Sequence, residues 1–169
     1  MTRPNQAWDS GLPKSVTKES QRTPAMKVTH AETIQMLFVR VLVVDDFSHW
    51  QDFVRVCLEK RPDVHILGVA TSGPEAIQKA EDLQPDLILL DISLPEMNGI
   101  QAAEQIRQLV PKSKIIFLTG QSDPEIVRDA FRAGGDGYIL KWDAAQELIV
   151  GMEAVLLGKR FTSRGIAEI

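Results

Sequence analysis

Short apolar runs alternate along this chain with stretches of helical periodicity. The runs are VRVLVV (39–44), HILGVA (65–70), DLILL (86–90), KIIFLT (114–119) and GYIL (137–140). Their nearly continuous apolar character is typical of strands that are covered on both faces in a parallel sheet. The intervening stretches place apolar residues at positions i, i+3, i+4 and i+7, which predicts amphipathic helices.

Five such helical stripes follow the five runs, over residues 50–58, 76–83, 100–109, 126–131 and 148–156. Five strands alternating with five helices predict an α/β fold, a doubly wound (βα)5 sandwich with a five-stranded parallel sheet and right-handed crossovers. This domain should span residues 38–158. We interpret residues 1–37 as a disordered leader, and residues 159–169 as a C-terminal tail or the start of a linker.

Charge and composition narrow the classes of function. Residues 1–30 carry five Lys or Arg and two acids, so the rest of the chain is more acidic than the net charge of −4 suggests. An acidic domain argues against direct nucleic-acid contact, which needs clustered cations. No apolar run approaches the length of a membrane span, and no secretory signal is visible. The single cysteine, Cys57, is compatible with a reducing cytoplasm, where we expect the protein to reside.

Polar side chains end several of the predicted strands. Asp45 and Asp46 follow the first strand, Asp91 the third and Lys141 the fifth, and Thr119 ends the fourth. Ligands of open parallel sheets bind outside the carboxyl ends of the strands, so these groups should meet at one edge. Three converging carboxylates repel one another unless a cation is present, and Mg²⁺ prefers carboxylate, water and phosphate oxygens. The set predicts a site for a phosphoryl group on or beside a carboxylate.

Each of these residues has a structural alternative when it is taken alone. Asp45 and Asp46 could be a helix N-cap and a first-turn acid, Asp91 could cap a turn, and Lys141 could be a solvated side chain. The joint placement of the residues at four strand ends, with each residue type suited to its role, favours the functional interpretation.

The segment from about Val39 to Gly158 resembles the receiver domain of two-component response regulators, a fold similar to CheY. The matching pieces are VLVVDD, PDLILLDISLPEMNG, IIFLTG and AGGDGYILK, in that order. The resemblance implies a flavodoxin-like sandwich with strand order 2-1-3-4-5. It also implies that the chain works as a phosphorylation switch that receives its phosphoryl group from a sensor histidine kinase or a phosphotransfer protein.

The resemblance assigns a role to each residue of the predicted site. Asp91 would be the phosphoacceptor, and Asp46 would ligate Mg²⁺ directly, with Asp45 acting through water or hydrogen bonds. The backbone carbonyl of Ser93 would be a further metal ligand. Lys141 would pair with Asp91 in the empty site and with a phosphoryl oxygen in the filled one.

The resemblance also implies how the signal leaves the site. Thr119 would move toward the phosphoryl group, and Tyr138, the switch aromatic, would turn inward behind it. The fourth helix, fifth strand and fifth helix, residues 125–157, would report the change and could form a homodimer. Without the resemblance, Tyr138 could equally pack on the sheet with its hydroxyl in solvent.

The end of the chain looks most like the NarL/LuxR subfamily, in which the GKRFTS region leads through a linker to a helix-turn-helix domain. Because the sequence stops at Ile169, we expect either the receiver part of a transcriptional regulator or a stand-alone receiver. The leader departs from the family pattern, and an internal start at Met26 or Met36 would explain it.

Two other functions fit part of this pattern. A Mg²⁺-dependent aspartyl-phosphate hydrolase uses similar residue types, but it places its nucleophile after the first strand in a D-x-D pattern, whereas here Asp45 is followed by Asp46 and Phe47. A degenerate receiver that only binds a partner is disfavoured because every chemical position is filled. We therefore expect a switch whose chemistry is limited to its own phosphorylation and dephosphorylation, and not an enzyme.

Overall fold

Residues 38–166, the part of the chain that the computed structural model describes, form a parallel sheet between two layers of helices. The strands are β1 (Val39–Val44), β2 (Val64–Ala70), β3 (Leu87–Leu90), β4 (Lys114–Thr119), β5 (Gly137–Leu140) and β6 (Phe161–Thr162). They lie in the order β2-β1-β3-β4-β5-β6. The reversal of order between β1 and β3 identifies a doubly wound sheet, whose ligands bind at the carboxyl ends of the strands.

The predicted order of the first five strands is confirmed, but the predicted number of strands is wrong. β6 is a sixth strand that pairs in parallel with β5, and it lies in the stretch interpreted as a tail or the start of a linker. Two residues are too few to show any periodicity, so a strand of this length leaves no pattern in the sequence. The predicted leader, residues 1–37, lies outside the described residues.

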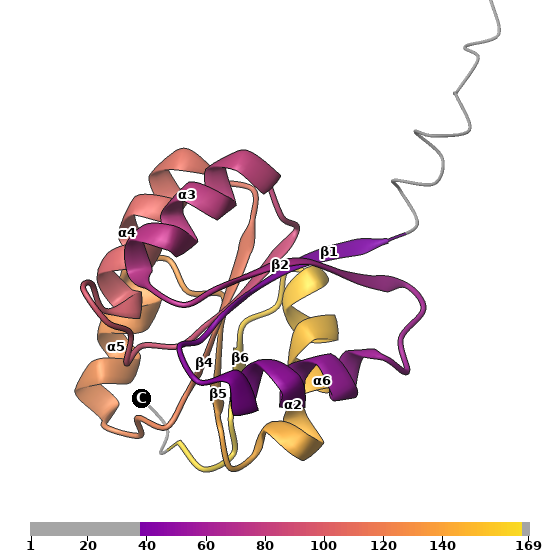
Figure 1. Ribbon diagram of the computed structural model, residues 1–169. Coiled ribbons are helices and arrows are strands. Elements are labelled where there is room, and N and C mark those ends of the chain that lie inside the picture. Colours follow the sequence, from indigo (N-terminus) through magenta and orange to yellow (C-terminus); the bar gives the residue numbers. More distant parts are fainter. Residues whose placement is uncertain (1–37, 167–169) are drawn as a thin grey trace, which may run out of the picture.

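Five helices connect and follow the strands: α2 (Ser48–Leu58), α3 (Gly73–Leu83), α4 (Gly99–Leu109), α5 (Pro124–Arg132) and α6 (Ala144–Leu156). Apolar residues of α3, α4 and α5 pack on one face of the sheet, and those of α2 and α6 pack on the other (Figure 1). Strand residues are therefore buried on both faces, which explains their continuous apolar runs. No helix within residues 38–166 is long and apolar enough to cross a membrane.

Side-chain caps fix where three of the helices begin. Ser72, Asn98 and Asp123 each accept a hydrogen bond from a backbone N–H in the first turn of α3, α4 and α5. These caps satisfy amide groups that have no partner inside the helix, so the chain turns into a helix soon after each strand. α2 has Phe47 at its N-cap position and no side-chain cap, so neither Asp45 nor Asp46 caps this helix.

Gly99 brings the start of α4 against the end of β3. A Cβ atom at this position would lie 2.0 Å from the carbonyl oxygen of Asp91, far inside van der Waals contact. The Gly99 N–H also donates to the carbonyl of Ile92 at 2.9 Å. A side chain here would push the loop away, so the glycine helps to fix the backbone that carries Asp91.

Candidate functional site

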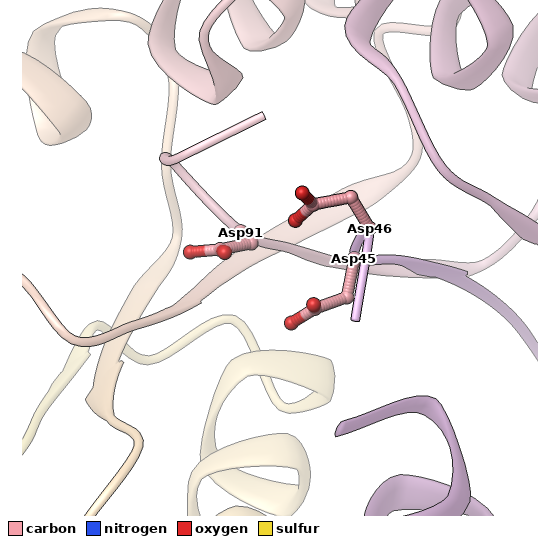
Figure 2. Close-up of side chains that lie close together, drawn as sticks. All are labelled: Asp45, Asp46 and Asp91. Carbon is pink, nitrogen blue, oxygen red and sulfur yellow. The ribbon is translucent and has the colours of Figure 1, made fainter. Parts of the chain in front are cut away.

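Three carboxylates meet where β1 and β3 end. Val44 and Leu90 are paired neighbours in the sheet, so Asp45 and Asp91 emerge side by side. Asp45, Asp46 and Asp91 each offer a carboxylate oxygen, and these oxygens lie within 4.8 Å of one another. Figure 2 shows the three side chains projecting to the same side of the strand ends. The predicted convergence of these aspartates is therefore present in the structure.

Lys141 places its ammonium between two of these carboxylates. Its Nζ lies 2.8 Å from Asp45 Oδ2 and 3.0 Å from Asp91 Oδ2, and only 12% of its side chain is exposed. The same Nζ lies 5.0 Å from the centroid of the Trp50 ring, a cation–π distance. One largely buried cation thus serves two buried acids, and the third acid, Asp46, is exposed to solvent.

The backbone holds the two buried aspartates firmly. The Asp91 N–H donates to the carbonyl of Val44 at 2.9 Å, which continues the sheet ladder beyond β3. Asp91 Oδ1 accepts from the Ile92 N–H at 2.7 Å, so each of its oxygens has a partner. Asp45 Oδ1 accepts from the Phe47 N–H at 2.9 Å. Both side chains are therefore preorganised, and neither is a flexible surface group.

Burial raises the pKa of Asp45 above its ordinary value of 3.8. The hydrogen bonds from Lys141 and the Phe47 N–H act in the opposite direction, and the nearby charge of Asp91 raises the pKa further. Burial therefore outweighs the bound lysine and disfavours the ionised form of Asp45. A further cation beside this carboxylate would favour the ionised form.

Gln121, in the loop after β4, is hydrogen-bonded to both Thr119 and Tyr138. The Gln121 N–H donates to Thr119 Oγ1 at 3.4 Å, and the Tyr138 hydroxyl donates to the Gln121 carbonyl at 2.9 Å. The Gln121 side chain reaches across to Ser93, whose Oγ accepts from Nε2 at 3.2 Å. Gln121 therefore joins the loops after β3 and β4 to the fifth strand.

Tyr138 is fully buried, with 0% of its surface exposed. Burial raises the pKa of its hydroxyl, and the negative charges of Asp91 and Asp123 add to the effect, so the group stays a neutral donor. The alternative in which this hydroxyl lies in solvent is wrong for this structure, because the hydroxyl donates to a backbone carbonyl.

Comparison with known proteins identifies the fold family. The protein-family model described as the response regulator receiver domain matches residues 41–153 of this sequence. The chain belongs to this family. The response regulator protein VraR of Staphylococcus aureus is 38% identical to this receiver over 127 residues, which make up 75% of this chain and 57% of that protein. The chain thus spans little more than half the length of the curated relatives it matches.

Solved structures agree with the receiver assignment. A two-component response regulator of the LuxR family from Aurantimonas sp. SI85-9A1 matches with a TM-score of 0.73 and 31% identity, covering 76% of this chain and 92% of that one. The signal receiver domain of the putative response regulator NarL from Mycobacterium tuberculosis matches with a TM-score of 0.68 and 28% identity, covering 72% and 98%. The predicted resemblance to NarL/LuxR receivers is confirmed.

The acidic cluster of this receiver could hold a metal ion. Its donors are carboxylate oxygens, which hard divalent cations such as Mg²⁺ prefer, and a bound cation would offset the cost of burying the ionised Asp45. The exposed Asp46 leaves one side of the cluster open to solvent, as a metal that keeps water ligands requires. The residues present therefore fit the ion.

Sequence reasoning missed one contact in the receiver site. Trp50 lies in the predicted apolar stripe of residues 50–58, yet its ring also faces the Lys141 ammonium. Its place in the first turn of α2, at the carboxyl edge of the sheet, was the available signal. Ser93 lies at this edge through its bond to Gln121, but its role as a metal ligand through the backbone carbonyl stays a prediction.

Proposed function

We propose that this receiver is a phosphorylation-dependent switch of a two-component system, with Asp91 as the phosphoacceptor. An oxygen of the Asp91 carboxylate attacks the phosphorus of a phosphohistidine on a sensor kinase or phosphotransfer protein. An aspartyl phosphate forms as the P–N bond breaks, and the bonding electron pair stays on the imidazole nitrogen. The observation that carries this proposal is the buried Asp91 carboxylate, which is bound by Lys141 and the Ile92 N–H beside two further acids.

Asp45, Asp46, Asp91 and the backbone carbonyl of Ser93 would hold Mg²⁺ in this proposal. The bound ion would supply neutralisation of the charge on the phosphoryl oxygens. Lys141 contributes a second positive charge, already largely buried and less than 3.1 Å from both partner carboxylates. It exchanges one carboxylate contact for a phosphoryl oxygen when the site fills, so little reorganisation is needed.

Thr119 and Tyr138 make one arrangement of the domain bind the phosphoryl group better than the other. The Thr119 hydroxyl donates to a phosphoryl oxygen, and Gln121, bonded to both residues, moves with it. A ligand shifts a conformational equilibrium only by binding one state better than the other. Since the Tyr138 ring is already buried in this structure, the phosphoryl group acts by holding it there.

The face formed by α5, β5 and α6 reports the state of the site to partners in this proposal, and a homodimer would use the same face. We expect the phosphoryl donor to be a cytoplasmic protein and the receiver to act in the same compartment. The receiver itself contacts neither nucleic acid nor membrane, and it serves either a transcriptional regulator or a stand-alone signalling role. A phosphohydrolase is disfavoured because the residues after β1 are Asp45, Asp46 and Phe47, which do not form the D-x-D pattern of those enzymes.

Phosphorylation by a small donor tests the proposal. Purified protein incubated with acetyl phosphate and Mg²⁺ should gain one phosphoryl group by intact-mass measurement, and Asp91→Asn should gain none. Asp82→Asn is the matched control because Asp82 is an exposed residue of α3, so this variant should be labelled like the wild type. Full labelling of Asp91→Asn would refute the assignment of the phosphoacceptor.

A further inference from the structure

The segment of residues 160–166, which we name the strap, lies along the outer edge of β5. It contains β6, whose residues Phe161 and Thr162 pair in parallel with Gly137 and Tyr138 (Figure 1). The Phe161 N–H also donates to the carbonyl of Asp136 at 3.3 Å. The strap thereby covers the edge of the strand that carries the proposed switch residue Tyr138.

Ser163 extends this pairing with its side chain. It is 2% exposed, its N–H donates to the Tyr138 carbonyl at 2.9 Å, and its Oγ accepts from the Leu140 N–H at 2.9 Å. Leu140 directly precedes Lys141, whose ammonium contacts Asp91. The strap is thus bonded to the same few residues of β5 that lead into the site.

Side chains anchor the strap on both faces of the sheet. Phe161 packs with the core on the α2 and α6 side, where a Cβ atom at Gly151 would lie only 2.9 Å from its ring. Ile166 belongs to the core on the other side, together with Tyr138. Docking of the strap therefore depends on how the residues of β5 and the surrounding core are arranged.

A chain of aromatic contacts connects the strap to the switch residue. The Arg160 guanidinium lies 4.6 Å from the centroid of the Phe131 ring in α5. The Phe131 ring in turn lies 6.4 Å, centroid to centroid, from the ring of Tyr138. Arg160, Phe131 and Tyr138 are packed in sequence, so the position of the Tyr138 ring affects how well Arg160 can dock.

We propose that the strap is a conformational reporter, which docks on β5 most tightly in the arrangement that the phosphoryl group at Asp91 favours. This inference rests on the proposed function and goes beyond it, because it assigns the readout to residues 160–166. Both the docked strap and the filled site stabilise the buried Tyr138 ring. Since coupling between two binding events is reciprocal, loosening the strap weakens binding at Asp91.

Titration with beryllofluoride and Mg²⁺ tests this coupling on the whole chain. Binding is followed by tryptophan fluorescence, because Trp50 lies beside Lys141. The half-saturating concentration should rise by about threefold or more in Ser163→Ala, and by a smaller factor in Arg160→Ala. Lys159→Ala removes the same charge from the exposed neighbouring residue and should leave the affinity unchanged.

Amide exchange measured by NMR supplies a second readout. Addition of beryllofluoride and Mg²⁺ to the wild type should slow exchange at the amides of Leu140 and Ser163, which donate two of the hydrogen bonds that join the strap to β5. If Ser163→Ala does not fold, Arg160→Ala and the exchange measurement still test the inference.

The outcomes separate the two proposals. A wild type that does not bind beryllofluoride, or an Asp91→Asn variant that binds it equally well, contradicts the proposed function itself. A wild type that binds while the strap variants bind with unchanged or higher affinity overturns the strap alone. Unchanged exchange at Leu140 and Ser163 in a protein that binds beryllofluoride overturns it as well.

Discussion

The two edges of the sheet use aspartate in opposite ways. At the amino edge, Asp63, Asp86 and Asp136 precede strands, and each pairs with at least one cation. Asp63 lies 2.8 Å from Arg61, Asp86 lies 3.1 Å from Arg40, and Asp136 lies 2.9 Å from Arg107 and 3.0 Å from Lys114. At the carboxyl edge, Asp45 and Asp91 share the single ammonium of Lys141, and the third aspartate, Asp46, is exposed to solvent beside them.

The paired carboxylates of the amino edge stabilise the fold, whereas the carboxylates of the carboxyl edge are available to bind a ligand. Arg61 holds the pKa of Asp63 below its ordinary value of 3.8, whereas burial holds that of Asp45 above it. A paired acid stabilises the fold when it is ionised, and an acid with a raised pKa does the reverse. A bound cation should therefore increase stability at the carboxyl edge but not at the amino edge.

Asp136→Ala should give the largest loss of stability. Asp136 accepts from Arg107, from Lys114 and from the Ile115 N–H, so its removal leaves three donors without this partner. We expect the free energy of unfolding to fall by about 3 kcal/mol, measured by urea denaturation. Labelling by acetyl phosphate below the unfolding transition should stay at the wild-type level. A complete loss of labelling in the folded variant would contradict the separate roles of the two sheet edges.

Lys141→Met should cost less stability than Asp136→Ala, but it should remove the cation that we propose to bind a phosphoryl oxygen. The substitution leaves Asp45 Oδ2 and Asp91 Oδ2 without their shared cation. We expect a loss of about 2 kcal/mol at pH 7, since buried carboxylates are left without a partner. Mg²⁺ should recover part of that loss in urea denaturation, because it binds the same acids. If Mg²⁺ leaves the stability of the variant unchanged, the acidic cluster is not a metal site.

Asp45→Asn should have the smallest effect on stability, and its sign depends on pH. Because the folded pKa of Asp45 is raised, the native state retains a proton that the unfolded state releases as pH rises above 3.8, so stability falls through this range. Asparagine cannot ionise, so the variant should lose less stability than the wild type between acidic and neutral pH.

Asp63→Asn is the matched control for this pH dependence. The pKa of Asp63 is lowered, so the wild type gains stability from this residue as pH rises toward and through 3.8, and the variant should forgo that gain. Opposite changes in the two stability profiles support the comparison of the edges. Parallel changes would refute it.

Much of the site could be predicted because its residues follow strong local signals. The apolar runs ending at Val44, Leu90 and Thr119 place three strand ends at one edge of a parallel sheet, and the polar residues there need only chain order to be brought together. The amphipathic stripes gave the helices for the same local reason, and the caps at Ser72 and Asp123 gave their starts.

The strap could not be predicted, because it depends on partners distant in the sequence. Phe161 fits against the sheet only where Gly151 leaves room, and Ser163 acts through main-chain groups of Tyr138 and Leu140. Main-chain groups are the same in every residue, so such contacts leave no mark in sequence composition or periodicity. The Trp50 contact with Lys141 is missed for a related reason, since an apolar stripe does not reveal what lies at its end.

Chemical trapping of the phosphoryl group tests the central claim most directly. Protein phosphorylated by acetyl phosphate is treated with borohydride, which reduces an aspartyl phosphate to homoserine, and the peptides are then sequenced by mass spectrometry. Our account predicts homoserine at position 91 and unmodified aspartate at positions 45, 46, 63, 86 and 136. Homoserine at position 45 or 46, or at any aspartate of the amino edge in place of position 91, would contradict it.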